Sequence, residues 1–131
     1  MATTTATLTL SSADLTGDAL SLSTTATLTK AGTVTGLDQF TGIARKTFSS
    51  TSQVTLIAKA DYTDDRAHKV YLKNTSTVAT ENLIVTIESQ LLGRLYAGDW
   101  ALLPFNGDQD IKITPSVATA MTVEYAVIYE A

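Results

Sequence analysis

The sequence predicts an all-β protein, a single-domain antiparallel β-sandwich or jelly roll with little helix. Short stretches in which apolar and polar residues alternate recur along the chain, and turn-forming residues separate them. Threonine, which fits strands better than helices, occurs 24 times in 131 residues. No segment longer than a turn repeats apolar residues at the helical period. The length suits one domain spanning residues 1–131.

Residues 1–30 predict an extended N-terminal arm or a hairpin. The hexapeptide TTATLT occurs at 4–9 and again at 24–29. In both copies Ala and Leu occupy even-numbered positions, as does the first Thr, and the other Thr residues occupy the odd ones, which indicates strands with one apolar and one hydroxylic face. Residues 11–18 between them predict a turn or short loop. Two copies are too few for a repeat array, so we expect them to pair with each other or with a neighbouring subunit.

The rest of the chain predicts a meander of short strands. Residues 31–52 are irregular and predict short strands and an exposed loop. A strand starting at Gln53 is expected to place Val54 and Leu56 on one face and Ile57 on the other. Further alternating segments at 68–73, 82–89, 91–105, 111–114 and 121–130 are separated by polar turns.

Composition excludes several classes of function. The net charge of −4 argues against a nucleic-acid binder, which usually carries a basic face. The absence of cysteine excludes disulfides, thiolate nucleophiles and Cys-ligated zinc. No apolar run approaches the ~18 residues that a membrane span needs, and no secretory signal is recognisable. We therefore expect a protein made in the cytoplasm, without a membrane partner.

The sequence contains no recognisable catalytic or metal-binding motif. Its one histidine, His68, is expected to be a surface residue of a strand, and no G-x-S-x-G motif frames a serine. The aspartates at 61, 64, 65, 108 and 110 lack the EF-hand pattern and are typical of turns. We therefore expect no catalytic residues, no metal and no cofactor, and a protein that is not an enzyme.

Two residues of the apolar stretch 91–105 stand out. Trp100 lies among leucines, which is typical of a core or interface residue, although an exposed indole also stacks on sugars. Arg94 interrupts an apolar strand, where it can pair with a carboxylate of a neighbouring chain or simply face solvent. The candidate assembly interface predicted from the sequence comprises Thr4, Ala6, Leu8, Leu10, Arg94 and Trp100.

Three segments between residues 70 and 130 resemble a known family. LLGRLYAGDWALLP at 91–104, VEYAVIYE at 123–130 and YLKNTS at 71–76 are similar to patterns in small β-rich structural proteins of tailed-bacteriophage virions. The resemblance implies a capsid decoration or cement protein, a homotrimer that stabilises the shell by binding a major capsid protein at capsomer junctions. Its expected location is the capsid surface. A tail or neck accessory protein and a carbohydrate-binding or adhesive β-sandwich module remain alternatives.

Overall fold

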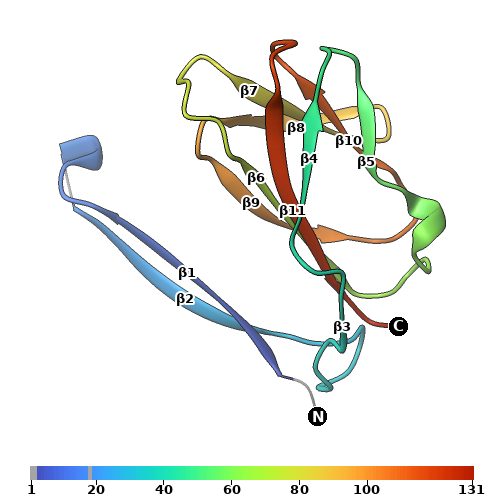
Figure 1. Cartoon of the computed structure of the whole chain (residues 1–131). Helices are drawn as coiled ribbons and strands as arrows, with labels where there is room; N and C mark the ends of the chain where they lie inside the picture. The colour runs from blue at the N-terminus through green and yellow to red at the C-terminus, as the bar shows by residue number, and fades with distance from the viewer. Residues whose placement is uncertain (1–2, 18) are drawn as a thin grey trace.

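The computed structural model describes residues 3–17 and 19–131 and confirms the all-β prediction (Figure 1). Strands make up 56% of the structure, and helical turns make up 4%. Those turns are the 3-10 segments η1 (Leu15–Gly17) and η2 (Lys59–Asp61). The strands are β1 (Thr4–Ser12), β2 (Leu20–Leu28), β3 (Gln39–Phe40), β4 (Ala44–Phe48), β5 (Val54–Ile57), β6 (His68–Asn74), β7 (Asn82–Ile87), β8 (Gln90–Tyr96), β9 (Trp100–Phe105), β10 (Ile111–Pro115) and β11 (Met121–Tyr129).

Two antiparallel sheets pack face to face and form the body of the protein. One sheet has the strand order β5-β10-β7-β8, and the other has the order β3-β11-β6-β9, with β4 also paired to β11. Residues 97–99 connect β8 in the first sheet to β9 in the second. The edge strands β8 and β9, each the last strand in the order of its sheet, therefore lie at the same side of the sandwich.

The core lies between the two sheets and follows the alternation of each strand. Val70 and Leu72 of β6 are fully buried, and so are Ile111 and Ile113 of β10 in the opposite sheet. Burying such a side chain stabilises the fold by about 1.5–3 kcal/mol. The alternate residues of β6, Lys69, Tyr71 and Lys73, point to the outer face of the body, which is the face relevant to function.

The strand expected from Gln53 is shorter than predicted, and the two faces of its residues differ in burial. β5 ends at Ile57, and residues 59–61 form the turn η2. Ile57 is 4% exposed, whereas Val54 and Leu56 are only half-buried. The register against β10 shifts between Ile111 and Lys112. A bulge of this kind reverses the alternation, because it adds one residue to one strand.

His68 is buried, so the expectation of a surface histidine is wrong. The residue is 1% exposed and shares the inward face of β6 with Val70. Its Nδ1 lies 3.2 Å from the carbonyl oxygen of Phe105. The rings of Tyr62 and Tyr129 pack against it at centroid distances of 5.3 Å and 6.2 Å. His68 therefore belongs to an aromatic cluster that closes one end of the core.

The strands β1 and β2 form a hairpin that projects from the body (Figure 1). The pairing runs without interruption from Thr4 opposite Leu28 to Ser12 opposite Leu20. The first TTATLT segment thus pairs with residues 23–28, which include most of the second copy. We call this hairpin, β1 and β2 together, the arm.

Removing the arm should leave the body folded. A chain beginning at Leu28 retains both sheets and every residue of the core cluster. We expect its free energy of unfolding to change by less than about 1 kcal/mol, because the lost hairpin contributes little to the core. Leu72→Ala, as the control, should lower it by about 2–5 kcal/mol. Thermal unfolding followed by circular dichroism measures both, and loss of cooperative unfolding on truncation would show that the arm belongs to the core.

A candidate assembly interface on the projecting arm

The arm has one apolar face and one hydroxylic face. Across the hairpin, Ala6 lies opposite Ala26 and Leu10 opposite Leu22, while Leu8 lies opposite Thr24. The other face consists only of threonine and serine, in the opposed pairs Thr5–Thr27, Thr7–Thr25, Thr9–Ser23 and Ser11–Ser21. The Oγ1 atoms of Thr7 and Thr25 are hydrogen-bonded at 2.9 Å. The period-2 alternation of both strands therefore produces a two-faced ribbon.

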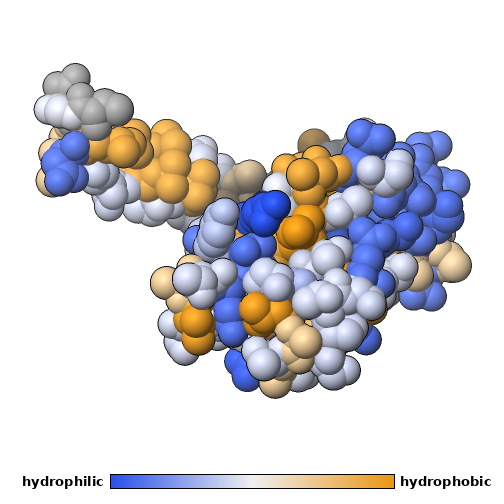
Figure 2. Space-filling view, turned by 90° about the horizontal axis from the view of Figure 1, so that it is seen from above, coloured by the Kyte–Doolittle hydropathy of each residue, from blue (hydrophilic) through white to orange (hydrophobic). Residues whose placement is uncertain are grey.

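The apolar face of the arm is largely open to solvent. Leu10 is 42% exposed and Leu22 is 43% exposed. Figure 2 shows a band of apolar side chains along the arm. An isolated two-stranded hairpin is at best marginally stable in water, since it has no second layer to cover its apolar side chains. An exposed apolar surface of this extent is typical of a binding surface.

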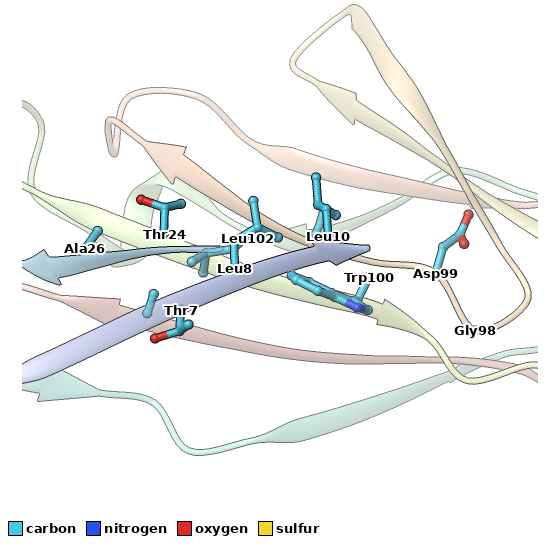
Figure 3. Close-up of a pocket in the computed structure, with 11 residues that line it drawn as sticks. Thr7, Leu8, Leu10, Thr24, Ala26, Gly98, Asp99, Trp100 and Leu102 are labelled. Atoms are coloured by element: carbon cyan, nitrogen blue, oxygen red, sulfur yellow. The ribbon is translucent and has the colours of Figure 1, made fainter. Parts of the chain in front are cut away.

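A groove separates the apolar face of the arm from the outer face of the body (Figure 3). Its volume is about 670 Å³. The wall on the arm includes Ala6, Leu8 and Leu10, and the wall on the body includes Trp100 and Leu102 of β9. Trp100 is 54% exposed and Leu102 is 39% exposed. The side chains of the two walls leave this space unfilled, so the groove is open to a further molecule.

The groove continues toward the root of the arm. A second hollow of about 270 Å³ shares Ala6 and Leu102 with the first. Phe40, Ile43 and Ile128 line it from the body, and Thr4 lines it from the arm. An apolar surface therefore runs from the root of the arm to the start of β9.

A buried carboxylate fixes the root of the arm to the last strand of the body. Glu130 is 4% exposed, and its Oε2 accepts the main-chain N–H groups of Ala31 at 2.6 Å and Ala67 at 3.2 Å. Its Oε1 accepts a hydrogen bond from the Arg66 guanidinium at 3.0 Å. The N–H of Ala31, together with Arg66 and the N–H of Ala67, holds the pKa of Glu130 below its usual value despite burial.

Further contacts hold the segment that follows the arm. Leu37 is 2% exposed and donates its N–H to the carbonyl of Leu28 at 3.1 Å. Lys30 binds the carboxylate of Asp38 at 2.5 Å, and this hydrogen bond is the main cause that lowers the pKa of Asp38. The arm therefore leaves the body in a defined direction.

The structure brings four of the six predicted interface residues to one groove. Ala6, Leu8, Leu10 and Trp100 line it together, although β1 and β9 are far apart in sequence. Thr4 lies at the root, in the second hollow. Arg94 lies elsewhere, on β8, where it lines a separate hollow between β8 and β9. Its Nη1 is 3.5 Å from Oδ1 of Asn82.

Sequence reasoning missed two important members of the interface. Leu22 belongs to the apolar face of the arm, and Leu102 lies beside Trp100 on the body. The alternation of residues 20–28 carried the signal for Leu22. Leu102 could have been found because it is two residues from Trp100, and residues i and i+2 of a strand share a face.

Several other polar groups outside the groove form structural contacts. No cluster of three or more metal-ligating side chains occurs in residues 3–17 and 19–131. Asp110 accepts the N–H of Lys59 at 2.8 Å, and Arg45 binds Glu124 through two nitrogens at 3.0 and 2.9 Å. In the same part of the chain, no helix is long and apolar enough to span a membrane.

Comparison with known proteins gives no relative. No family model, no curated protein and no solved structure matches this chain. The function must therefore be inferred from the arm, the groove and the residues that form them.

The Glu130 carboxylate makes the root of the arm sensitive to acid. Because its folded-state pKa is lowered, its stabilising effect is complete above the ordinary value of 4.5 and disappears as the pH falls through the lower folded value. The NMR chemical shift of the Ala31 amide proton should therefore follow the titration of Glu130 and change below pH 4.5. Glu130→Gln should abolish this titration, whereas the neighbouring control Asp38→Asn should retain it. An Ala31 amide that titrates equally in both variants would contradict the assignment.

Proposed function

We propose that this chain is a non-enzymatic structural protein of a virion, a capsid decoration or cement protein. In this role it associates with other copies of itself and binds the major capsid protein at the junctions between capsomers, on the capsid surface. The observation that carries the proposal is the projecting arm, whose apolar face is held away from the body and exposed. The resemblance of residues 70–130 to small virion proteins supports the choice of a virion.

The arm suits a protein that joins neighbouring subunits. Covering one of its half-exposed leucines yields on the order of 1 kcal/mol, so four leucines on one face yield a few kcal/mol. A shell presents many equivalent sites. A copy that is already bound through one contact forms its further contacts at a high effective concentration, which raises its overall affinity. Because the protein binds only the assembled shell, binding stabilises the shell by mass action.

Binding to shells tests the proposal directly. Shells of the major capsid protein from the same virus, prepared without this chain, are mixed with the purified protein and sedimented. We expect the wild-type protein to sediment with them. Leu10→Asp should weaken binding at least about tenfold, because it places a charge on the apolar face.

The matched control is Thr9→Asp, which adds the same charge to the adjacent, hydroxylic face of β1. It should bind nearly as well as wild type. Wild-type protein that stays in the supernatant would refute the decoration role, and sedimentation with tails or necks instead of shells would assign it to those structures.

Carbohydrate binding is a second candidate function, favoured by the exposed indole of Trp100. Its neighbour Asp99 is oriented by a hydrogen bond from the Tyr96 N–H to Oδ2 at 2.9 Å. An aromatic face beside an oriented carboxylate is suited to a sugar ring, because sugars present both C–H and O–H groups. If this function is correct, the protein should bind on a glycan array and Trp100→Ala should abolish binding. Absence of any glycan signal for the wild type would reject it.

A further inference from the structure

We propose that the apolar face of the arm is covered by the same face of the arm in a second copy of this chain. The second arm enters the groove between Leu8 and Leu10 on one side and Trp100 and Leu102 on the other. This inference rests on the proposed assembly function and names the partner of its central surface. It concerns contact between copies in solution, so it can be tested without a shell.

The chemistry of the arm favours a partner like itself. Neither nine-residue strand contains a charged residue, although charged residues make up 17% of the chain. A surface without charge offers no electrostatic complementarity to a charged partner. Shape and apolar contact must then select the partner.

The size of the side chains changes along the apolar face in a way that makes it complementary to itself. The row nearest the root is Thr4 with Leu28, followed by Ala6 with Ala26, the middle row Leu8 with Thr24, and then Leu10 with Leu22 and Ser12 with Leu20 toward the tip. A two-fold axis through the middle row, perpendicular to the strands, places the tip of one arm over the root of the other. The Ala6–Ala26 row of each copy then faces the Leu10–Leu22 row of its partner. The Thr4–Leu28 row, in which Leu28 is already buried, faces the Ser12–Leu20 row. Facing sheets pack best when large residues oppose small ones.

The same arrangement gives the hydroxylic face a suitable surface. When one arm lies in the groove of the other copy, its Thr and Ser side chains face the partner's body. The outer face of that body is mixed, because Lys73 lies beside Trp100 and Tyr71 beside Leu102 across the β6–β9 pair. Hydroxyl groups can bond to such polar neighbours, and threonine methyl groups can pack on the indole. The apolar face of the arm therefore meets an apolar face, and its hydroxylic face meets the mixed, partly polar face of the partner's body.

The dimensions are sufficient for a specific dimer. A strand of nine residues is about 30 Å long, and a two-stranded ribbon is about 10 Å wide. Pairing two such faces covers about 300 Å² on each copy, or about 600 Å² in total, and a similar area between each hydroxylic face and the partner's body brings the sum above the ~1,000 Å² that a specific interface needs. The hydroxylic faces add contact with both bodies. A two-fold contact of this kind is closed, so it yields a dimer, in place of the homotrimer that the resemblance implies, and not a filament.

Variants that introduce opposite charges at position 8 test the contact, since the axis places Leu8 of one copy opposite Leu8 of the other. We expect the wild-type chain to be a dimer of twice 13.9 kDa by light scattering. Leu8→Asp and Leu8→Lys alone should each dissociate about a hundredfold more readily, because like charges then meet. An equimolar mixture of the two should recover the dimer. Thr55→Asp and Thr55→Lys, at an exposed position of β5 in the opposite sheet, should remain dimeric.

Cross-linking gives a second readout that does not depend on charged variants. The chain has no cysteine, so introduced thiols are unique. Facing sheets lie about 10 Å apart, beyond the roughly 7 Å that a disulfide spans between Cα atoms, so a short bismaleimide is required. Ala6→Cys mixed with Leu10→Cys should form a cross-linked pair of chains, and Thr7→Cys mixed with Thr9→Cys should not.

Three outcomes would overturn the inference. They are a wild-type monomer at every concentration, a trimer, or equal cross-linking on both faces. A wild-type monomer or trimer that still sediments with shells would leave the proposed function standing. A dimer with the expected cross-links that ignores shells would support this inference and reject the decoration role.

Discussion

The arrangement of the molecule depends on the Glu130 carboxylate at the root of the arm. Its two oxygens accept hydrogen bonds from three donors, contributed by Ala31, Arg66 and Ala67. A buried carboxylate is stable only with such partners, so these donors must stay in place around it. The carboxylate therefore ties the segment following the arm to the end of the last strand. Without this tie the arm would be a flexible tether, and ordering it on binding would oppose association.

A second constraint follows from the position of the arm outside the sandwich. A sheet in the body is covered by the opposite sheet, whereas the arm has to be compatible with water on both faces. Threonine meets this requirement on one face, because it favours strands and keeps a hydroxyl in solvent. Alanine and leucine on the other face limit the exposed apolar area near the root and concentrate it toward Leu10 and Leu22. The result is a ribbon with one hydroxylic face and one partly exposed apolar face.

Period-2 alternation allowed much of the fold to be predicted, since it is a local property. It identified both strands of the arm and the inward residues of β6, and it placed His68 on the same face as Val70. The surface assignment of His68 ignored that register and relied on its charged neighbours. The burial of the Ile57 side chain could not be predicted, because the bulge that turns it inward arises from pairing with β10, far along the chain. The placement of Leu8 and Trp100 on opposite walls of one groove is also non-local, because only the direction of the arm brings these two residues to the same groove.

The modest strength of each contact is consistent with the proposed role. A stronger apolar arm, built from isoleucine or phenylalanine, would aggregate before assembly, since its unpaired strand edges and apolar face would be exposed together. An interface near the lower size limit instead associates reversibly and permits correction of misplaced subunits. In the proposed role, the same weak contact would be repeated at every site of a shell, and linkage between the sites would supply the strength that one contact lacks. The directed root held by Glu130 and the sparse apolar face thus serve the same end, because a fixed direction lets a weak surface find its partner without a large entropic penalty.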